Sequence, residues 1–551
     1  MSELNITSEK GPKVQEKQTS MADAGRESTF SLSVTTNQDE RASSDASIEE
    51  THQLVPRTSF LHPHLPRFED YHLRERTSKT IHDAVSSEKE FWARLTGRNR
   101  RERGEHIPGW VESSRNIATS SYLNYILIFV PFAWVAHFLH WNENLIFGLC
   151  FVAIIPLAKL FEWGGEQMDM YLGKDLGDLM TVTLNNAIEA TLAIILLMRC
   201  ELRLLQSVIV GVVILHLLLI PGTSFLVGGA RVLEQELHSF HTQLNWSLLT
   251  IGVLTIFLPT AFFAALDRGI KSISDAGELQ FDTSLVNDEV RGQLLRMSRG
   301  LAVMLLIVYI CSRIFLTSHG PPGEGGAGTV HELAPVEHKK KEKKLKHDDT
   351  KANPWACIIL LVFTIGIMAT TAEFLVESAE KVRERGHIQE EWFGLVILPL
   401  VSFSADGFIA AVYFIRSVIN HILRRKPIEL STLAKARAID LSIQFTLFWV
   451  PLLVLLAWWI SKPFHLMFDY FEVAMLLGSC FLVNYVTADS KTNWVEGLIL
   501  VVFYMMIATC AWFYRGQEQL ELMLVCTKTV AEALISNPDM LEHAAAAAGE
   551  H

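Results

Sequence analysis

The sequence predicts an all-α polytopic membrane protein with about 11 transmembrane helices, and three observations carry this prediction. Half of the 551 residues are hydrophobic, and the mean hydropathy is +0.24. From about Arg115 onward, apolar runs of roughly 20 residues follow one another almost to the end, and a helix needs this length to cross the hydrocarbon core. The runs lack the alternation of barrel strands, and in lipid only helices or closed barrels satisfy their backbone.

Eleven apolar segments qualify as spans. Their approximate bounds are 119–140, 143–162, 176–198, 204–228, 246–266, 297–317, 354–376, 392–416, 438–460, 469–488 and 494–514. A long polar segment lies between the sixth and seventh, and it ends in the basic run KKKEKKLKH at 339–347. With the first span set aside, five spans precede this segment and five follow it. An odd number per half makes the halves enter the membrane from opposite sides, so we expect one leading helix plus two inverted five-helix repeats.

The predicted domain organisation has five parts. They are a disordered cytosolic N-terminal region with a basic juxtamembrane stretch (1–115), the first helix plus the first repeat (116–317), a cytosolic basic loop (318–353), the second repeat (354–516) and a C-terminal tail (517–551). The N-terminal region has the low hydrophobicity that is typical of disorder. Positive charge from Arg94 to Arg103 favours a cytosolic N-terminus, and six spans then return the basic loop to the cytosol. Arg199 and Arg203 fall on the opposite side and count against this orientation.

Composition and motifs exclude several other classes. The formal charge of −12 gives no reason to expect nucleic acid binding. The seven cysteines form no CxxC pair, so the sequence indicates neither a disulfide framework nor a zinc site. No cationic start is followed by an apolar core, so we expect no cleaved signal peptide. The chain has no HExxH or GxSxG motif and no convincing pair of catalytic aspartates, which argues against an enzyme.

Ionisable side chains inside the spans are the candidate functional residues, because they are costly in hydrocarbon and usually line a cavity or a pathway. In the third span, TVTLNNAIEATLAI places Asn186 and Glu189 three residues apart, on one helical face. A carboxylate there either serves an ion or is neutralised by a proton or a neighbouring helix. The eighth span is the counterpart in sequence order and carries Asp406 beside Gly407, where a helix kink is the alternative role.

Other polar positions extend this set. Glu166 and Glu373 pair across the halves near span ends, where a solvated or capping role is equally open. Asp440 and Gln444 lie one turn apart in the ninth span, and His216 stands alone among apolar residues of the fourth. Ca2+ takes six to eight hard oxygens, from carboxylates, amide carbonyls and water. Oxygens that hold either a proton or a metal ion, never both, give exchange without a separate coupling device.

Several segments carry a resemblance to a known family. They are SSYLNYILIFVPFAWVAHFLHW in the first span, NNAIEATLAI in the third, LLLIPGTSFLVGGARVLEQELHSF in and after the fourth, AEFLVES in the seventh and WVEGLILVVFYMMIA in the last. Over roughly 110–516 the chain resembles the vacuolar-type Ca2+/H+ exchangers of the Ca2+/cation antiporter superfamily. The resemblance implies an antiporter of the vacuolar membrane or another endomembrane that uses a proton gradient to remove cytosolic Ca2+. We expect no cofactor, and the expected partners are the transported ions Ca2+ and H+ and the lipid bilayer.

The resemblance also implies a site. Each half of that family carries a Gly-Asn-Ala-x-Glu signature whose carboxylate binds the ion. In the first half only the leading glycine is changed, to Asn185, whereas in the second half Phe403 replaces the asparagine and Asp406 the glutamate. The implied ion-binding and transport residues are Glu189, Asn186, Asp406, Gln444, Glu166, Glu373 and Asp440, with Glu189 and Asp406 as the metal ligands.

Two alternatives stay open at this point. Phe403 removes an oxygen ligand, which favours a monovalent cation/H+ exchanger because Na+ or K+ needs fewer oxygens than Ca2+. The changed second signature also fits a non-transporting regulator or scaffold, whose basic loop would contact anionic lipid or a protein. The sequence leaves the oligomeric state and the regulation open.

Overall fold

The computed structural model describes residues 107–172, 174–229, 235–236, 239–269, 287–318, 350–404, 434–489 and 491–526, together with positions 407, 412, 415 and 419. The predicted disordered region, most of the basic loop and Asp406 lie outside the described residues.

The elements of the two halves follow in chain order. The first half has α3 (Trp110–Ala118), the 3-10 helix η1 (Tyr122–Ile128), α4 (Phe129–Phe138), α5 (Glu143–Leu172), α6 (Lys174–Asn185), α7 (Ala187–Arg199), α8 (Leu202–Ile214), the π-helix η2 (Leu215–Leu219), α9 (Ile220–Gly229), β1 (Gln235–Glu236), α10 (Ser239–Gly269) and α11 (Asp288–Ser318). The second half has α13 (Pro354–Gly386), α14 (Glu390–Trp392), the π-helix η4 (Phe393–Ile397), α16 (Ala434–Gln444), the π-helix η5 (Phe445–Trp449), α17 (Val450–Trp459), α18 (Tyr470–Val486), β2 (Lys491–Thr492), α19 (Trp494–Trp512) and α20 (Glu518–Leu524).

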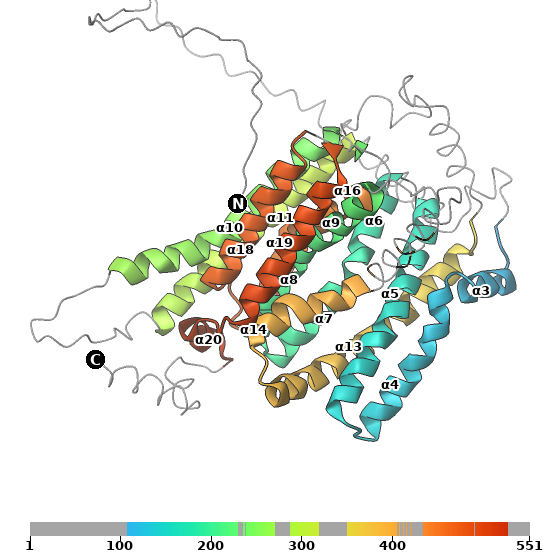
Figure 1. Ribbon diagram of the computed structural model, residues 1–551, viewed down its shortest axis with the longest axis horizontal. Helices are drawn as coiled ribbons and strands as arrows, with labels where there is room; N and C mark the ends of the chain where they lie inside the picture. Colours follow the sequence, from blue (N-terminus) through green and yellow to red (C-terminus); the bar gives the residue numbers. More distant parts are fainter. Residues whose placement is uncertain are drawn as a thin grey trace, which may run out of the picture. The chain divides into compact units, whose positions relative to one another are not determined.

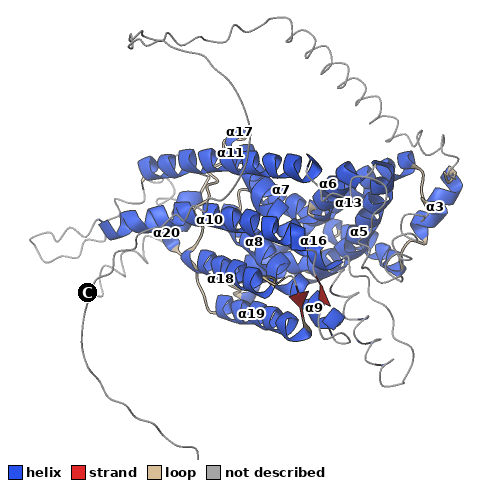
Figure 2. Ribbon diagram, turned by 90° about the horizontal axis from the view of Figure 1, so that it is seen from above, coloured by secondary structure: helices blue, strands red, loops and turns tan. Residues whose placement is uncertain are grey.

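These elements form a helical membrane bundle (Figures 1 and 2). In the described part, seven helices are long and apolar enough to cross a bilayer, and two further pairs pass the same test as bent spans. The bent pairs are Trp110–Ala118 with Tyr122–Phe138, at 85°, and Leu179–Asn185 with Ala187–Arg199, at 52°. The shorter α18 supplies the tenth predicted span, and residues 390–404 are helical at the start of the eighth. The predicted all-α polytopic fold is confirmed.

The fourth and ninth spans occupy the same place in their repeats and share a local feature. In each, a π-helical segment (η2 or η5) is followed at the second position by a proline, Pro221 or Pro451. Proline has no N–H, so it cannot close the helical hydrogen bond to the carbonyl four residues back, which belongs to Leu217 or Leu447. Both of these carbonyls lie within the π-helical segments. Single π-helical turns often mark functional sites.

The fourth span forms the centre of the bundle. In its most apolar window 94% of residues are buried, against 28% to 61% for the other six long spans. Its α8 segment packs directly on η4 of the second half at Gly211. A Cβ at Gly211 would lie 2.8 Å from the Cα of Leu395, so the two backbones approach as closely as small residues allow.

The two halves also meet at the second and seventh spans. Figure 1 shows α5 and α13 side by side, and they share an extensive contact. The chain that enters α13 is tied to the end of α5, because the Tyr171 hydroxyl donates to the Ala352 carbonyl (2.8 Å) and the Lys351 N–H donates to Gln167 Oε1 (2.9 Å). Asn353 then caps α13 by accepting from the Trp355 N–H, so the second repeat begins in contact with the first.

A two-stranded antiparallel pairing fixes the chain before the last span. Gln235 pairs with Thr492 and Glu236 with Lys491. Asn493 then starts α19 with a reciprocal capping box to Glu496, which satisfies backbone N–H groups at the helix start.

One expectation from the sequence is wrong. Cys200 and Cys526 form a disulfide, although no spacing in the sequence indicated one. The two cysteines are 326 positions apart and their Cα atoms are 6.4 Å apart, because helix packing brings the turn after α7 beside the segment after α20. The other five cysteines are free.

Candidate functional site

The third span breaks at Asn186, where the sequence predicts an ion site. The helices α6 and α7 meet there at 52°, and Asn186 has φ −90° and ψ 7°. Its side chain is fully buried. Asparagine favours such a break because its side chain competes for backbone hydrogen bonds. Broken backbone at membrane depth is tolerated only where it faces protein or a cavity, so this break marks an internal polar site.

Glu189 lies one turn beyond the break, in the first turn of α7. Its side chain is only 3% exposed, and its Oε1 lies 3.6 Å from Nε2 of His216. His216 belongs to η2 in the fourth span, so the irregular turn before Pro221 presents a ring nitrogen to the carboxylate. The lone histidine of the fourth span is therefore part of the same buried group as Glu189.

Gln444 connects three spans around the break. Its Oε1 accepts from Asn186 Nδ2 (2.9 Å), and its Nε2 donates to the Thr183 hydroxyl (2.7 Å) and the Tyr309 hydroxyl (3.1 Å). Asn186 Nδ2 also donates to the Leu441 carbonyl (3.2 Å). These bonds use the Nδ2 group of Asn186. Its Oδ1 is buried and has no hydrogen-bond partner in the described part of the chain. The break therefore holds a buried amide oxygen that is available to a cation.

The remaining ninth-span and eighth-span candidates have different surroundings. Asp440 lies one turn before Gln444, and its Oδ1 accepts from Asn245 Nδ2 of α10 (2.7 Å). Asp406 lies outside the described residues. Ser402 and Ser404 each donate to a carbonyl of their own helix, three residues back.

Glu166 and Glu373 lie apart from this group. Glu166 is an exposed side chain of α5. Glu373 is 55% exposed and faces Arg199 Nη2 at 3.4 Å, near the end of α7. Among the described contacts neither carboxylate touches Asn186, Glu189 or Gln444. The structure thus brings together Asn186, Glu189, Gln444 and His216, and keeps the paired glutamates at the bundle surface.

The sequence argument missed two hydroxyl residues of the site. Thr183 is three positions before Asn186, on the same helical face as the signature, and this spacing was a usable signal. Tyr309 is a polar side chain in the middle of the sixth span, and nothing local links it to the third or ninth span. Only the packing of α11 against η5 and α17 brings it to Gln444.

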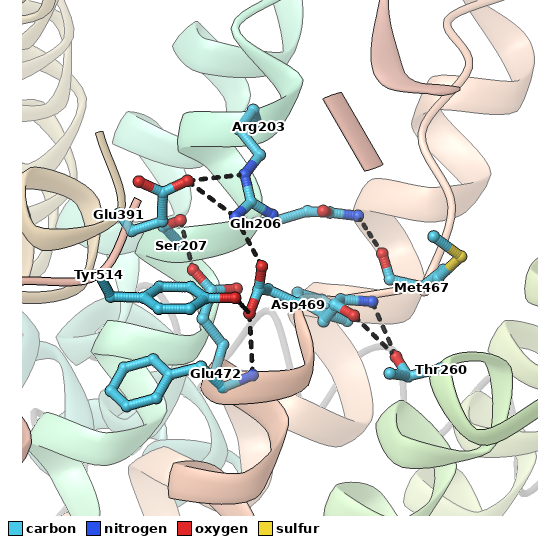
Figure 3. Close-up of polar contacts among 11 residues, drawn as sticks. Arg203, Gln206, Ser207, Thr260, Glu391, Met467, Asp469, Glu472 and Tyr514 are labelled. Carbon is cyan, nitrogen blue, oxygen red and sulfur yellow. Dashed lines mark hydrogen bonds and ion pairs between the residues drawn. The ribbon is translucent and has the colours of Figure 1, made fainter. Parts of the chain in front are cut away.

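A second buried polar group, at one end of the bundle, was also missed (Figure 3). Arg203 Nη2 lies 2.9 Å from Glu391 Oε1 and 3.1 Å from Asp469 Oδ2. The Tyr514 hydroxyl donates to Asp469 Oδ1 (2.7 Å), and the Ser207 hydroxyl donates to Glu472. We refer to this group as the Arg203 cluster. The charge of Arg203 is paired with buried carboxylates. Its position on the side opposite the predicted cytosolic face therefore weighs less against the predicted orientation.

The Arg203 cluster joins the ends of several helices at one face of the bundle. Arg203 and Glu391 lie in the first turns of α8 and α14, and Asp469 is the N-cap of α18, while Tyr514 follows α19. Gln206 extends the group by donating to the carbonyls of His465 (2.9 Å) and Met467 (2.8 Å). Removing one partner of such a buried group is strongly destabilising, by about 3–5 kcal/mol, so the Arg203 cluster locks this end of the bundle.

The described side chains offer carboxylate, amide and hydroxyl oxygens at the break, the ligand types that hard cations take. Within the described ranges, no group of three or more His, Cys, Asp or Glu is placed to hold a metal ion. A carboxylate with amide oxygens beside it suits an ion that is bound and released, and it also suits a proton.

Comparison with known proteins agrees with this architecture. The sequence profile described as "Sodium/calcium exchanger protein" matches residues 143–318 and 355–513. A vacuolar calcium ion transporter of Schizosaccharomyces pombe is 31% identical, covering 73% of this chain and 88% of that relative. A Ca(2+)/H(+) antiporter of Synechocystis is 28% identical, covering 71% and 96%. The structure titled native YfkE has a TM-score of 0.51 at 20% identity, covering 71% of this chain and 100% of that chain.

A helical membrane bundle in which a span breaks beside buried polar side chains of both halves is typical of secondary membrane transporters. The chain belongs to the sodium/calcium exchanger protein family. It is an integral membrane transporter.

Proposed function

We propose that this protein is a secondary active antiporter that exchanges Ca2+ for protons across the vacuolar membrane or another endomembrane and removes Ca2+ from the cytosol. The observation that carries the proposal is the broken third span, where Asn186 is buried against Gln444 of the opposite half and Glu189 is buried one turn further on, beside His216. The relatives named as vacuolar calcium ion transporters and Ca2+/H+ antiporters support the choice of ions. Basic residues before the first span and after the sixth support a cytosolic N-terminus and central loop.

In this proposal Glu189 is the shared ligand of the two transported ions. Its carboxylate binds Ca2+ or a proton, and the two are mutually exclusive because they need the same oxygens. Asn186 Oδ1 is the amide oxygen beside it that is free to join the ion. Gln444 positions Asn186 by accepting a hydrogen bond from its Nδ2 (2.9 Å), so a change in the ninth span reaches Asn186 directly. Asp406 and Asp440 would supply carboxylates from the second half, and Glu166 and Glu373 would serve ion entry or protonation.

The test is uptake of radiolabelled Ca2+ into acid-loaded proteoliposomes that contain the purified full chain, with and without a protonophore. We expect uptake that collapses with the proton gradient. Glu189→Gln keeps the shape of the side chain but removes its charge, and we expect it to reduce uptake to the level of protein-free vesicles. Glu384→Gln makes the same chemical change at an exposed end of α13 and should leave uptake intact. Proton-driven Ca2+ uptake by correctly folded Glu189→Gln would refute the role of Glu189.

One observation favours a second candidate, a monovalent cation/H+ exchanger. His216 presents a nitrogen beside Glu189, which leaves fewer oxygens there than the six to eight that Ca2+ takes, and Na+ or K+ needs fewer oxygens than Ca2+. Parallel uptake of radiolabelled Na+ and Rb+ in the same vesicles separates the two functions. Gradient-driven Na+ or Rb+ uptake without Ca2+ uptake would replace the first proposal, and no uptake of any cation by folded, inserted protein would leave the non-transporting regulator.

A further inference from the structure

The chain does not leave the bundle after the last span. Residues 514–526, which we name the C-terminal strap, fold back over the end of the bundle that carries the Arg203 cluster. Within the strap, α20 packs on α8, and Leu520 and Met523 are fully buried. The Val525 carbonyl accepts from Arg291 Nη2 of α11 (3.2 Å). The strap is thus a packed element rather than a loose end.

The strap lies directly on the Arg203 cluster. Tyr514 donates to Asp469 (Figure 3), and two residues later Gly516 adopts φ +80°, a left-handed conformation that glycine accepts readily. A Cβ at Gly516 would collide with Glu391 Oε1 and would lie 2.9 Å from Arg203 Nη2. The strap backbone therefore passes in close contact with the buried ion pair and shields it from solvent.

The disulfide holds both ends of this arrangement. Cys200 is the C-cap of α7 at φ 69°, in the turn that leads into α8 and Arg203. Cys526 is the last residue of the strap, and Tyr514 is the first. Tyr514 contacts Asp469 and Cys526 is bonded to Cys200, so both ends of the strap are attached at the same face of the bundle. A Cα separation of 6.4 Å is within the range of protein disulfides.

We propose that the Cys200–Cys526 disulfide is a covalent staple that fastens the C-terminal strap over the Arg203 cluster, on a face that lies in an oxidising, non-cytosolic compartment. Disulfides persist in such compartments and are rare in the cytosol. Starting from a cytosolic N-terminus, the turn after the third span and the segment after the eleventh both reach the opposite side. The compartment therefore rests on the proposed orientation, whereas the staple itself is independent of which ion is carried.

The staple forms by thiol–disulfide exchange with a disulfide-bearing oxidoreductase of that compartment. The thiolate of one cysteine attacks the disulfide of the oxidoreductase and gives a mixed disulfide, with release of one thiol on the oxidoreductase. The thiolate of the second cysteine then displaces the remaining oxidoreductase sulfur. The two cysteines lose two protons and two electrons in total, and the oxidoreductase leaves as a dithiol.

Thiol counting on the purified, denatured full chain tests the staple. With a polymer-tagged maleimide we expect five reactive thiols without reductant and seven after reduction. Cys526→Ser should expose Cys200, so that all six remaining thiols react without reductant. Cys510→Ser, at an exposed free cysteine, should keep the reduction-dependent gain of two. Seven reactive thiols in the unreduced wild type, or loss of the gain in Cys510→Ser, would overturn the pairing.

Two further measurements test its role and its location. The double variant Cys200→Ser, Cys526→Ser should melt at a lower temperature than wild type, whereas Cys311→Ser, Cys510→Ser, at the two exposed free cysteines, should not. Equal melting of both double variants would refute the fastening role. In sealed microsomes a membrane-impermeant phosphine should reduce the disulfide only after permeabilisation, and reduction in intact microsomes would refute the non-cytosolic face. None of these readouts depends on ion transport.

Discussion

At the scale of single residues, Gln444 links the spans that surround the break in the third span. Its amide satisfies Asn186, Thr183 and Tyr309 at once, and all of its contacts cross to other spans. An amide is suited to this task because it donates and accepts without carrying charge into the bundle. Asn186, the proposed amide ligand, is thereby held in place by a neutral residue of the opposite half.

Replacing Gln444 should therefore affect both stability and transport. In Gln444→Leu the Asn186 amide keeps only its bond to the Leu441 carbonyl and the Thr183 hydroxyl only its bond to the Leu179 carbonyl, while the Tyr309 hydroxyl loses its bond to Gln444. A buried polar group left unsatisfied costs roughly 1–3 kcal/mol. We expect a clearly lower melting temperature and loss of gradient-driven uptake. Gln389→Leu, at a half-buried glutamine whose side chain forms no cap hydrogen bond, is the matched control and should melt like wild type. Wild-type melting of Gln444→Leu would show that the contacts of Gln444 contribute little.

At the scale of elements, the contact between α8 and η4 sets how closely the halves approach. Gly211→Ala would push a methyl group into the Leu395 backbone, which cannot move as a side chain does. Overpacking of this kind typically costs about 1–3 kcal/mol. We expect a lower melting temperature and reduced uptake, because the fourth and eighth spans must separate.

Gly300 provides the control for that substitution. It lies in α11 with open space where a Cβ would be added. Gly300→Ala should be neutral or slightly stabilising, since alanine is the better helix former by up to ~1 kcal/mol. If both alanine variants melt alike, close packing at Gly211 does not limit the approach of the two halves.

The sequence predicted the individual helices better than the contacts between them. Apolar length defined the eleven spans, because crossing a bilayer imposes its own constraint on each segment. Asn186 and Glu189 were predictable together, since their spacing lies within one helix. The contacts of Gln444 with Tyr309 and of Arg203 with Asp469 were not, because they depend on how distant helices pack. The Cys200–Cys526 pair was missed for the same reason.

At the scale of the whole molecule, the face that carries the strap must stay folded across the pH range of its compartment. Two titratable groups outside the spans, Glu201 and His465, change the stability with pH in opposite directions. Burial, followed by the charges of Glu380 and Glu390, raises the pKa of Glu201 above its ordinary value of 4.5. A carboxyl with a raised folded-state pKa contributes stability below its unfolded value and loses it as pH rises through the folded value. Glu201→Gln should therefore raise the melting temperature at pH 7, and this gain should vanish below about pH 4.5. A gain of equal size at both pH values would contradict the titration of Glu201.

His465 acts in the opposite direction. It is fully buried in the segment before α18, and burial together with the nearby charge of Arg291 lowers its pKa from 6.5 to about 4. A group with a depressed folded-state pKa gives stability above its unfolded value and loses it as pH falls, here between 6.5 and about 4. A shift of this size is worth roughly 3 kcal/mol, so acidification should destabilise the wild type through this histidine.

His465→Asn tests this without removing the local hydrogen bond, because the asparagine oxygen can replace Nδ1 as the acceptor for the Met467 N–H. We expect the melting temperature of His465→Asn to fall less than that of wild type between pH 7 and pH 4. His387→Asn is the matched control, since His387 is exposed at φ 48°, a conformation that asparagine also adopts. It should follow the wild-type pH dependence. If His465→Asn does so as well, the acid sensitivity of the molecule arises from another group.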